Sequence, residues 1–393
     1  MDVRLLRLLR LPPHTRRRLI AITACVLAAS VGLRAEVRSP AEDWPLARGD
    51  AQATGVAHTR LPTPLKVAWK FSAKEGGFEG AVAIAGGVVY AGSLDGNLYA
   101  IDFTSGKKKW AYKTELGFSA PPAVRDGRVF VGDADGKFYC LDAASGDLKW
   151  TAEAGGEIDS SANFYKDAVL FGSQDATLYC LEAKTGKPVW KYSIGDQIRC
   201  SPTIADNRVF LAGCDSKLHV IDLDQGKAVD TVPIDAPTGS TPAVLGEHVY
   251  FGTEGATFFC IDWRSAKVVW TYKGKRNMPL RSSAAVTDQL VIFGGRDKQV
   301  VALDRSDGAP RWTFATRARV DGSAVVVGER VYVGSADGRL YGLELKTGKK
   351  VWEYEAGGQF VASPAVAEGR LVIGNTDGTL YCFGKGAGAN DER

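Results

Sequence analysis

The stretch that decides the fold reads RVFVGDADGKFYCLD over residues 128–142, and Gly146 and Trp150 follow it. Its two strand-like halves meet at an Asp-Gly pair, a pattern typical of a β-hairpin with a tight turn. Similar hairpins recur with a period of about forty residues. They begin at Gly87, Arg128, Ala168, Arg208, His248, Leu290, Arg330 and Arg370. Glycine is expected at the turn because φ is positive there; it occupies positions 96, 136, 338 and 378.

A further strand-like segment lies beside each hairpin and carries a tryptophan at a fixed position. These residues are Trp69, Trp110, Trp150, Trp190, Trp270, Trp312 and Trp352. Asp230 takes the place in the remaining repeat, and successive positions are 40–42 residues apart. About forty residues per four short strands is the length of one β-propeller blade.

The ends of the repeat predict how the ring closes. Residues 66–71 form a tryptophan strand that precedes every hairpin, whereas the last hairpin, residues 370–383, has no such strand after it. We therefore expect an all-β, eight-bladed β-propeller of four-stranded antiparallel blades, with the N-terminal strand completing the last blade. An open solenoid would need capping repeats at both ends, and none is visible.

Two segments carry a family resemblance. AIDFTSGKKKW at residues 100–110 and GLELKTGKKVW at 342–352 resemble the tryptophan-docking repeat of pyrroloquinoline-quinone (PQQ) propellers, and the resemblance covers about 320 of 393 residues. It implies the same eight-bladed fold. It also implies one of two uses, since that family includes quinoprotein dehydrogenases and non-catalytic relatives such as the BamB-like outer-membrane assembly lipoproteins, and a fold alone does not choose between them.

The positive charge of the chain is confined to its start. The formal net charge is +4, but residues 1–35 contain seven arginines and one acid, so residues 36–393 carry 42 basic and 44 acidic side chains. This balance does not support a phosphate-binding surface, and we expect no nucleic-acid partner. Residues 16–18 are arginines and residues 19–33 are uncharged, which is typical of an export signal. A cleaved signal, a lipoprotein signal ending at Cys25 and a retained anchor remain open, and all three place the protein in the periplasm or at the cell envelope.

Most repeat residues have a structural interpretation. The acid that begins each turn after the third strand can accept backbone N–H groups, and the tryptophan ring can cover the gap between blades. Cys140, Cys180, Cys260 and Cys382 share one repeat position that is otherwise small and apolar, so we expect them to be buried. Cys200 and Cys214 flank another hairpin and either form a disulfide or remain two unpaired thiols. The histidines and cysteines show no zinc-binding spacing, and no nucleophile elbow, P-loop or dinucleotide fingerprint is present.

The resemblance allows the enzyme hypothesis to be tested further. Quinoprotein dehydrogenases of the family stack their quinone on a disulfide of adjacent cysteines, and this sequence has no adjacent cysteines. It also lacks long insertions between repeats, which leaves little chain for a deep cofactor chamber. The sequence therefore favours a protein that is not an enzyme and holds no cofactor.

The candidate binding residues lie just before the innermost strand of each blade. Five of these eight positions are charged: Glu79, Asp159, Arg199, Arg281 and Asp321. Either they are solvated loop ends without a ligand, or they line a polar funnel mouth that binds a peptide, a protein loop or a small polar ligand. Arg199 and Arg281 are the best charged candidates because both lie on blades near the irregular Asp230.

These observations divide the chain into four parts: a signal or anchor (1–35), an extended segment (36–65), the propeller (66–383) and a disordered tail (384–393). We expect a monomeric, exported scaffold that binds a protein or peptide partner and reaches a membrane only through a retained N-terminal segment. A small PQQ-dependent quinoprotein oxidoreductase is the alternative.

Overall fold

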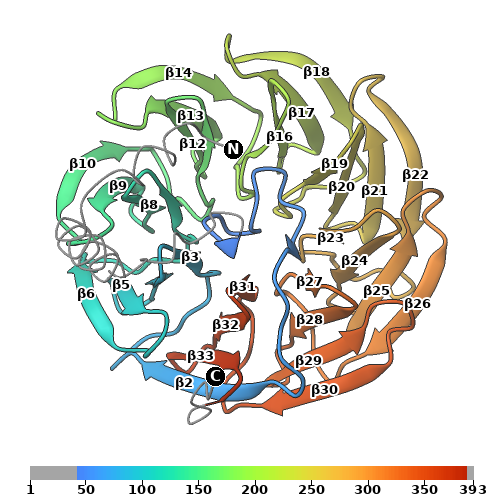
Figure 1. Cartoon of the computed structure of the whole chain (residues 1–393). Helices are drawn as coiled ribbons and strands as arrows, with labels where there is room; N and C mark the ends of the chain where they lie inside the picture. Colours follow the sequence, from blue (N-terminus) through green and yellow to red (C-terminus); the bar gives the residue numbers. More distant parts are fainter. Residues whose placement is uncertain (1–41, 387–393) are drawn as a thin grey trace, which may run out of the picture. The chain divides into compact units, whose positions relative to one another are not determined.

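The computed structural model describes residues 42–386, which form eight β-sheets arranged as blades around a central axis (Figure 1). This confirms the predicted eight-bladed propeller. We number the blades from 1 to 8 in chain order and name the strands of each blade inner, second, third and outer.

The inner strands surround the axis. They are β3 (Ala83–Ala85), β7 (Ala123–Arg125), β11 (Asn163–Tyr165), β15 (Thr203–Ala205), β19 (Ala243–Leu245), β23 (Ala285–Val286), β27 (Val325–Val327) and β31 (Ala365–Ala367). The second strands are β4 (Val88–Gly92), β8 (Arg128–Gly132), β12 (Ala168–Gly172), β16 (Arg208–Ala212), β20 (His248–Gly252), β24 (Leu290–Gly294), β28 (Arg330–Gly334) and β32 (Arg370–Gly374).

The third and outer strands complete each blade. The third strands are β5 (Asn97–Asp102), β9 (Lys137–Asp142), β13 (Thr177–Glu182), β17 (Lys217–Asp222), β21 (Thr257–Asp262), β25 (Gln299–Asp304), β29 (Arg339–Glu344) and β33 (Thr379–Gly384). The outer strands are β6 (Lys108–Lys113), β10 (Leu148–Glu153), β14 (Pro188–Ser193), β18 (Lys227–Pro233), β22 (Lys267–Lys273), β26 (Pro310–Ala315), β30 (Lys350–Glu355) and, in blade 8, β2 (Lys66–Ser72).

Blade 8 closes the ring with strands from both ends of the described chain. β2 pairs antiparallel with β33, from Lys66 opposite Gly384 to Ser72 opposite Thr379, and the two strands lie side by side in Figure 1. The predicted closure by the N-terminal strand is therefore confirmed. The predicted turn glycines also have positive φ, between 75° and 84°.

The tryptophans of the outer strands dock each blade onto the next one. Trp69 donates its indole N–H to the carbonyl of Phe103 at 2.9 Å, and Trp352 donates to the carbonyl of Leu65 at 3.1 Å. Five further tryptophans repeat the contact in the blades between. The ring lies flat on a glycine of the neighbouring blade, because a Cβ on Gly106 would be 2.7 Å from the Trp69 ring.

The junction between blades 4 and 5 uses a different tryptophan. Asp230 is exposed on β18, and Ala266 stands in blade 5 where the glycine would be. Trp263 fills the junction from blade 5: it is only 8% exposed and packs edge-on against Phe210 of blade 4, with ring centroids 5.5 Å apart. Its indole N–H donates to the carbonyl of Gly246 at 3.1 Å.

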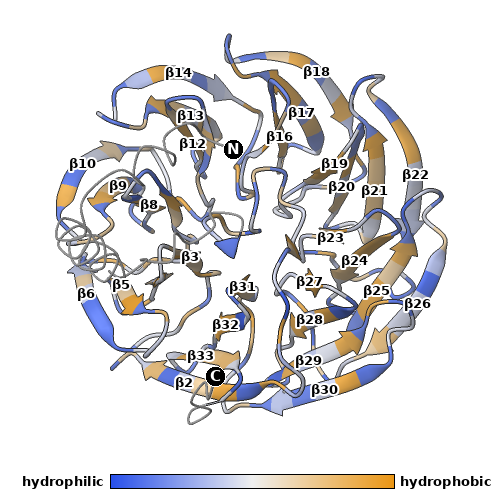
Figure 2. Cartoon of the chain, in the orientation of Figure 1, coloured by the Kyte–Doolittle hydropathy of each residue, from blue (hydrophilic) through white to orange (hydrophobic). Residues whose placement is uncertain are grey.

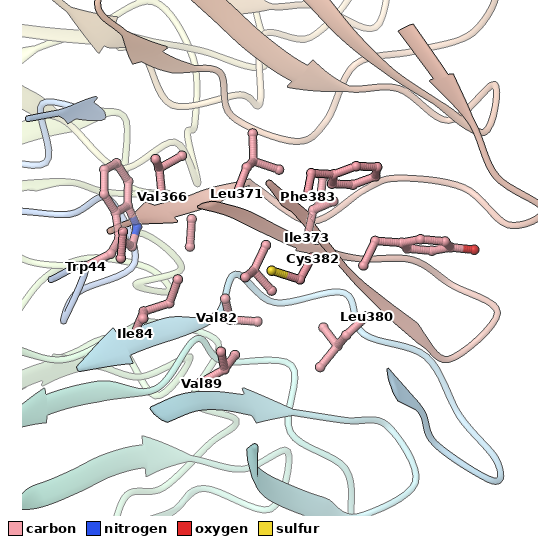
Figure 3. Close-up of a cluster of buried hydrophobic side chains, with 14 of the residues drawn as sticks. Trp44, Val82, Ile84, Val89, Val366, Leu371, Ile373, Leu380, Cys382 and Phe383 are labelled. Carbon is pink, nitrogen blue, oxygen red and sulfur yellow. The ribbon is translucent and has the colours of Figure 1, made fainter. Parts of the chain in front are cut away.

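The hydrophobic core lies between adjacent blades. In Figure 3, Val82, Ile84 and Val89 of blade 1 face Val366, Leu371 and Ile373 of blade 8, with Trp44 and Cys382 in the same cluster. Cys140, Cys180, Cys260 and Cys382 are all buried, as their shared repeat position predicts. Outer strands such as β6 carry long hydrophilic stretches (Figure 2), because one of their faces meets solvent.

Residues 42–59, which we call the plug, cross the end of the axis next to the turns between inner and second strands (Figure 1). The plug includes β1 (Val56–Ala57), which pairs parallel with β27. Its carbonyl oxygens accept inner-strand N–H groups at 2.8–2.9 Å from six blades. The pairs are Trp44 with Ile84, Pro45 with Val124, Ala51 with Ile204, Gln52 with Val244, Thr54 with Val286 and Gly55 with Val326. The extended N-terminal segment is therefore tied to the propeller, and Trp44 is 2% exposed.

Within residues 42–386, no helix is long and apolar enough to cross a membrane. The proposed signal at residues 1–35 and most of the proposed tail lie outside the described residues.

Candidate functional site at the funnel mouth

Two concentric sets of residues surround the axis on the face opposite the plug. The inner set precedes the inner strands and contains the residues singled out from the sequence. The outer set comes from the turns between second and third strands, and its backbone N–H groups bond to the loops of the inner set, for example Gln174 to Glu157 at 2.9 Å and Glu254 to Pro237 at 3.0 Å. This contact recurs in all eight blades. We call the two sets together the funnel mouth.

Three of the five predicted residues share one hollow in the funnel mouth. Asp159, Arg199 and Arg281 line a depression of about 520 Å³ over blades 3 to 6. Its remaining walls are Asp196, Gln197, Cys214, Pro237, Thr238, Gly239 and Glu254. The sequence placed these residues on one ring, and the structure brings three of them to one site.

The blade 3 side of the hollow is acidic. Gln174 bridges two carboxylates there, donating from Nε2 to Glu157 at 3.0 Å and to both oxygens of Asp159 at 3.1 Å. Burial raises the pKa of Asp159, and burial together with the Asp159 charge raises the pKa of Glu157. Two carboxylates held this closely destabilise each other when both are ionised, so this side would gain from a cationic or hydrogen-bond-donating ligand.

Blades 4 and 6 supply the hollow with two guanidinium groups that differ in their partners. Arg281 is held by Glu254 through two hydrogen bonds of 2.7 and 3.1 Å, which raise its pKa. Arg199 is exposed and donates only to the Gln197 side-chain oxygen, at 3.0 Å. Among residues 42–386 no carboxylate forms an ion pair with Arg199, although its charge lowers the pKa of Asp159 and Glu157 in part against the effect of burial. Its guanidinium can therefore still donate hydrogen bonds to a ligand.

The other two predicted residues lie outside the hollow. Asp321 is held by two arginines, with Arg296 bidentate at 2.8 and 3.1 Å and Arg319 at 2.7 Å. Glu79 is an exposed residue of blade 1. The structure therefore separates a structural Asp321 and an isolated Glu79 from the three residues that meet.

The partners of these charges were missed by sequence reasoning. Gln174, Glu254 and Arg296 occupy one position of the outer set, with Leu94, Ala134, Cys214, Ala336 and Thr376 as its other occupants. Their spacing follows the same repeat as the inner set, so the periodicity could have found the second ring. It could not show that the two rings touch.

The two cysteines near the hollow are not joined to each other in the described structure. Cys200 and Cys214 are both free thiols, so the disulfide that the sequence left open is absent from residues 42–386. Cys200 is buried, which raises its pKa to about 12. No cluster of histidine, cysteine and acidic side chains within the described part of the chain has the arrangement of a metal site.

A second hollow, of about 430 Å³, lies on the plug face between blades 2 and 3. Arg125 stacks over Phe164 there at 5.4 Å, and Arg128 donates to the carbonyls of Ala183 and Lys184 at 3.0 and 2.8 Å. These side chains are engaged in contacts between the blades, so we assign this hollow a structural role.

The chain matches the family model described as outer membrane protein assembly factor BamB over residues 66–272, 201–324 and 296–390. No curated protein sequence gives a significant match. Solved structures with the same fold include BamB from Moraxella catarrhalis, which is 20% identical with a TM-score of 0.71 and aligns over 81% of this chain and 99% of its own.

Two other solved structures represent different uses of the fold. Quinohemoprotein alcohol dehydrogenase from Comamonas testosteroni is 16% identical with a TM-score of 0.77, covering 90% of this chain and 82% of its own. The computationally designed Ika8 protein is 17% identical with a TM-score of 0.71, covering 79% and 97%. At these identities the structures establish the fold alone.

Proposed function

Because this chain belongs to the family of the outer membrane protein assembly factor BamB, we propose that it is a non-catalytic, exported scaffold that binds a protein or peptide partner at the funnel mouth. The proposed role at the cell envelope follows the family's description and the export signal predicted in residues 1–35. That the protein acts as a monomer stays a prediction.

The observation that carries the proposal is the charge arrangement of the hollow. Arg199 forms no ion pair with a carboxylate within residues 42–386. On the neighbouring blade the pKa values of Asp159 and Glu157 stay raised although the charge of Arg199 opposes the rise. An extended peptide presents carbonyl groups, N–H groups and side chains of both signs, so it can satisfy the acidic and the basic groups at once. Charge complementarity of this kind contributes to specificity and to the rate of association.

The same geometry argues against the oxidoreductase alternative. Quinone catalysis requires a water-excluding chamber with fixed polar groups around the cofactor. The hollow is instead an open depression between exposed Arg199 and Arg281. We accordingly propose no cofactor and no catalytic residue.

Reversal of the two arginines tests the proposal. A tagged full-length protein should co-purify with specific membrane proteins from its native host, and Arg199→Glu with Arg281→Glu should reduce this capture at least about tenfold, as expected when charge complementarity becomes like-charge repulsion. Thermal unfolding should change little, since exposed charges contribute about 0–1 kcal/mol.

The matched control carries the same change of charge on the plug face. Lys107→Glu with Lys346→Glu alters two exposed lysines in turns between third and outer strands, and it should leave capture unchanged. Equal capture by both double variants would move the interface away from the funnel mouth. Stoichiometric PQQ binding with dye-linked dehydrogenase turnover in the presence of calcium would refute the scaffold function.

A further inference from the structure

Arg48 of the plug is a buried cation on the axis of the propeller. Its side chain is 4% exposed, and Nη2 donates to the carbonyls of Ala284 at 3.1 Å and Ala324 at 2.7 Å. The N–H of Val326 donates to the carbonyl of Gly55 in the plug, so this edge of the blade 7 inner strand faces the axis. Ala324 lies two residues earlier and therefore presents its carbonyl on the same edge. The guanidinium therefore lies at the axis, between blades 6 and 7.

The backbone of the plug holds this guanidinium in place. Gly55 has φ +65°, and a Cβ there would lie 2.0 Å from Arg48 Nη2. Glycine is thus required both for the backbone conformation and for the close approach of the guanidinium.

The charge of Arg48 is only partly compensated. Its Nε and Nη1 are buried, and neither has a hydrogen-bond partner within residues 42–386. Asp50 is the neighbouring carboxylate, but Thr54 donates to it from both its backbone N–H and its hydroxyl. Burial lowers the pKa of Arg48 to about 10, so the guanidinium is charged at neutral pH. A buried charge with two unused donors is costly unless an anion accompanies it.

A ring of hydroxyl groups surrounds the axis on the funnel-mouth side of Arg48. It occupies the repeat position directly before that of Ala284 and Ala324. Its members are Ser161, Ser201, Thr241, Ser283, Ser323 and Ser363. Five of these hydroxyls accept a hydrogen bond of 2.9–3.1 Å from the backbone N–H of the equivalent residue in the preceding blade, as Ser201 does from Ser161. Ser161 Oγ is buried without a partner, because the equivalent position in blade 2 is Pro121, which has no N–H.

The hydroxyl hydrogens of this ring remain free. None of the six hydroxyls donates a hydrogen bond to a residue in the described range 42–386, although five already act as acceptors. Ser283 and Ser323 directly precede Ala284 and Ala324, whose carbonyls hold Arg48. The base of the funnel therefore carries unused O–H donors one residue from the carbonyls that hold Arg48, whose Nε and Nη1 are also unused.

We propose that the base of the funnel is an anion-binding site, in which a small monovalent anion, a halide or a carboxylate group, sits between the hydroxyl ring and the guanidinium of Arg48. O–H and guanidinium N–H donors stabilise negative charge, and the positive charge of Arg48 repels a cation. The plug closes one end of the axis, so the anion enters through the funnel mouth. The site is independent of the proposed partner binding.

Crystals of the full-length protein soaked in sodium bromide provide the direct test. We expect an anomalous peak at the base of the funnel, within hydrogen-bonding distance of Arg48 and at least one ring hydroxyl. Water alone at that position, both in crystals soaked in bromide and in crystals soaked in acetate, would overturn the proposal.

Thermal unfolding provides the second test. Increasing bromide should raise the Tm of the wild-type protein by about 3 °C or more, as for ligands that bind only the folded state. Arg48→Met should abolish this rise, and Arg60→Gln, at an exposed arginine just beyond the plug, should retain it. An equal rise in all three proteins would be a general salt effect and would overturn the proposal.

Two additions keep the test decisive. If Arg48→Met does not fold, Ser323→Ala replaces it, and it should reduce the bromide-dependent rise without removing the guanidinium. Parallel titrations with sodium acetate distinguish the two kinds of anion. A rise of the Tm with bromide alone assigns the site to a free halide, and a rise of the Tm with acetate assigns it to a carboxylate.

Discussion

Three substitutions at the junction between blades 4 and 5 depend on one another. The tryptophan of an outer strand normally lies on a glycine of the next blade, where a Cβ would collide with the ring. Because Asp230 removes that ring, Ala266 has room for its methyl group although its φ is +55°. Trp263 then supplies the missing aromatic surface from the other side of the junction, against Phe210. In blade 2 the equivalent ring, Phe130, packs instead against Trp150 of its own blade, at 5.9 Å.

Trp263 should therefore be as important for stability as a docking tryptophan. Trp263→Ala is expected to lower the free energy of unfolding by about 3–5 kcal/mol, as for other large-to-small changes at buried aromatic residues. Chemical denaturation measures this difference. Val229→Ala, at a residue 54% exposed on β18, is the control and should cost at most about 0.5 kcal/mol. A similar small cost for Trp263→Ala would mean that the junction tolerates a cavity.

His219 replaces a tyrosine of the repeat in blade 4. In blades 1 and 3 the corresponding hydroxyl donates to the aspartate of the preceding turn, as Tyr99 does to Asp95 at 2.6 Å. His219 occupies this place with Nε2 3.1 Å from Asp215 and Nδ1 3.0 Å from the hydroxyl of Tyr192. Burial lowers its pKa from the usual 6.5, although Asp215 opposes the shift.

This environment predicts a pH-dependent stability. In the unfolded chain His219 takes up a proton near pH 6.5, whereas the folded protein resists it, so stability should fall as the pH drops below 6.5. His219→Tyr restores the repeat and should make the decline between pH 7 and 5 shallower in thermal unfolding. His58→Gln, at an exposed histidine, should leave the decline unchanged. Identical pH profiles for wild type and His219→Tyr would contradict the assignment.

Among the elements, β2 has the greatest effect on the integrity of the ring. It provides the outer edge of blade 8, places Trp69 against blade 1 and begins one residue after Leu65, which accepts the Trp352 indole of blade 7. Three successive blades therefore depend on one strand that lies far from its partners in the sequence. Loss of β2 would expose β33 as a bare sheet edge, which promotes aggregation.

Deletion of residues 36–72 should abolish cooperative melting or cause aggregation, because blade 8 loses its outer strand and the axis loses its plug. Scanning calorimetry and light scattering measure these effects. Lys70→Pro in the full chain is the milder variant: Lys70 pairs with Tyr381, and proline there should lower the Tm without removing the plug. Deletion of residues 387–393 is the control and should change little. Parent-like melting of the large deletion would refute closure by β2.

At the scale of the whole described ring, the plug makes the two faces unequal. It covers the axis on one face through backbone hydrogen bonds to six blades, while the other face keeps the open hollow of Asp159, Arg199 and Arg281. A ligand can therefore reach the axis from the funnel mouth, which holds the proposed partner site and leads to the proposed anion site at the base of the funnel. The charge pattern of the funnel mouth follows from the arrangement of the blades, because each blade contributes one residue to each of the two concentric sets.

The sequence by itself determined the number of blades, the tryptophan docking and the closure by residues 66–71. These features repeat every 40–42 residues and depend on contacts between a blade and its neighbour, so the period of the pattern is sufficient to predict them.

Only the tertiary structure decided which of the charges of the inner set meet, which are already paired and what occupies the axis. Glu254 binds Arg281, and Arg296 binds Asp321, between loops of neighbouring blades. The spacing of these residues in the sequence does not give the distance between the loops. Trp263 fills the place of Asp230 from the opposite side of the junction, out of register with the repeat. Arg48 lies outside the repeat altogether, and its partners Ala284 and Ala324 are more than 230 residues away in the chain. Such contacts depend on the positions of side chains in space, and a periodic sequence fixes only the backbone that carries them.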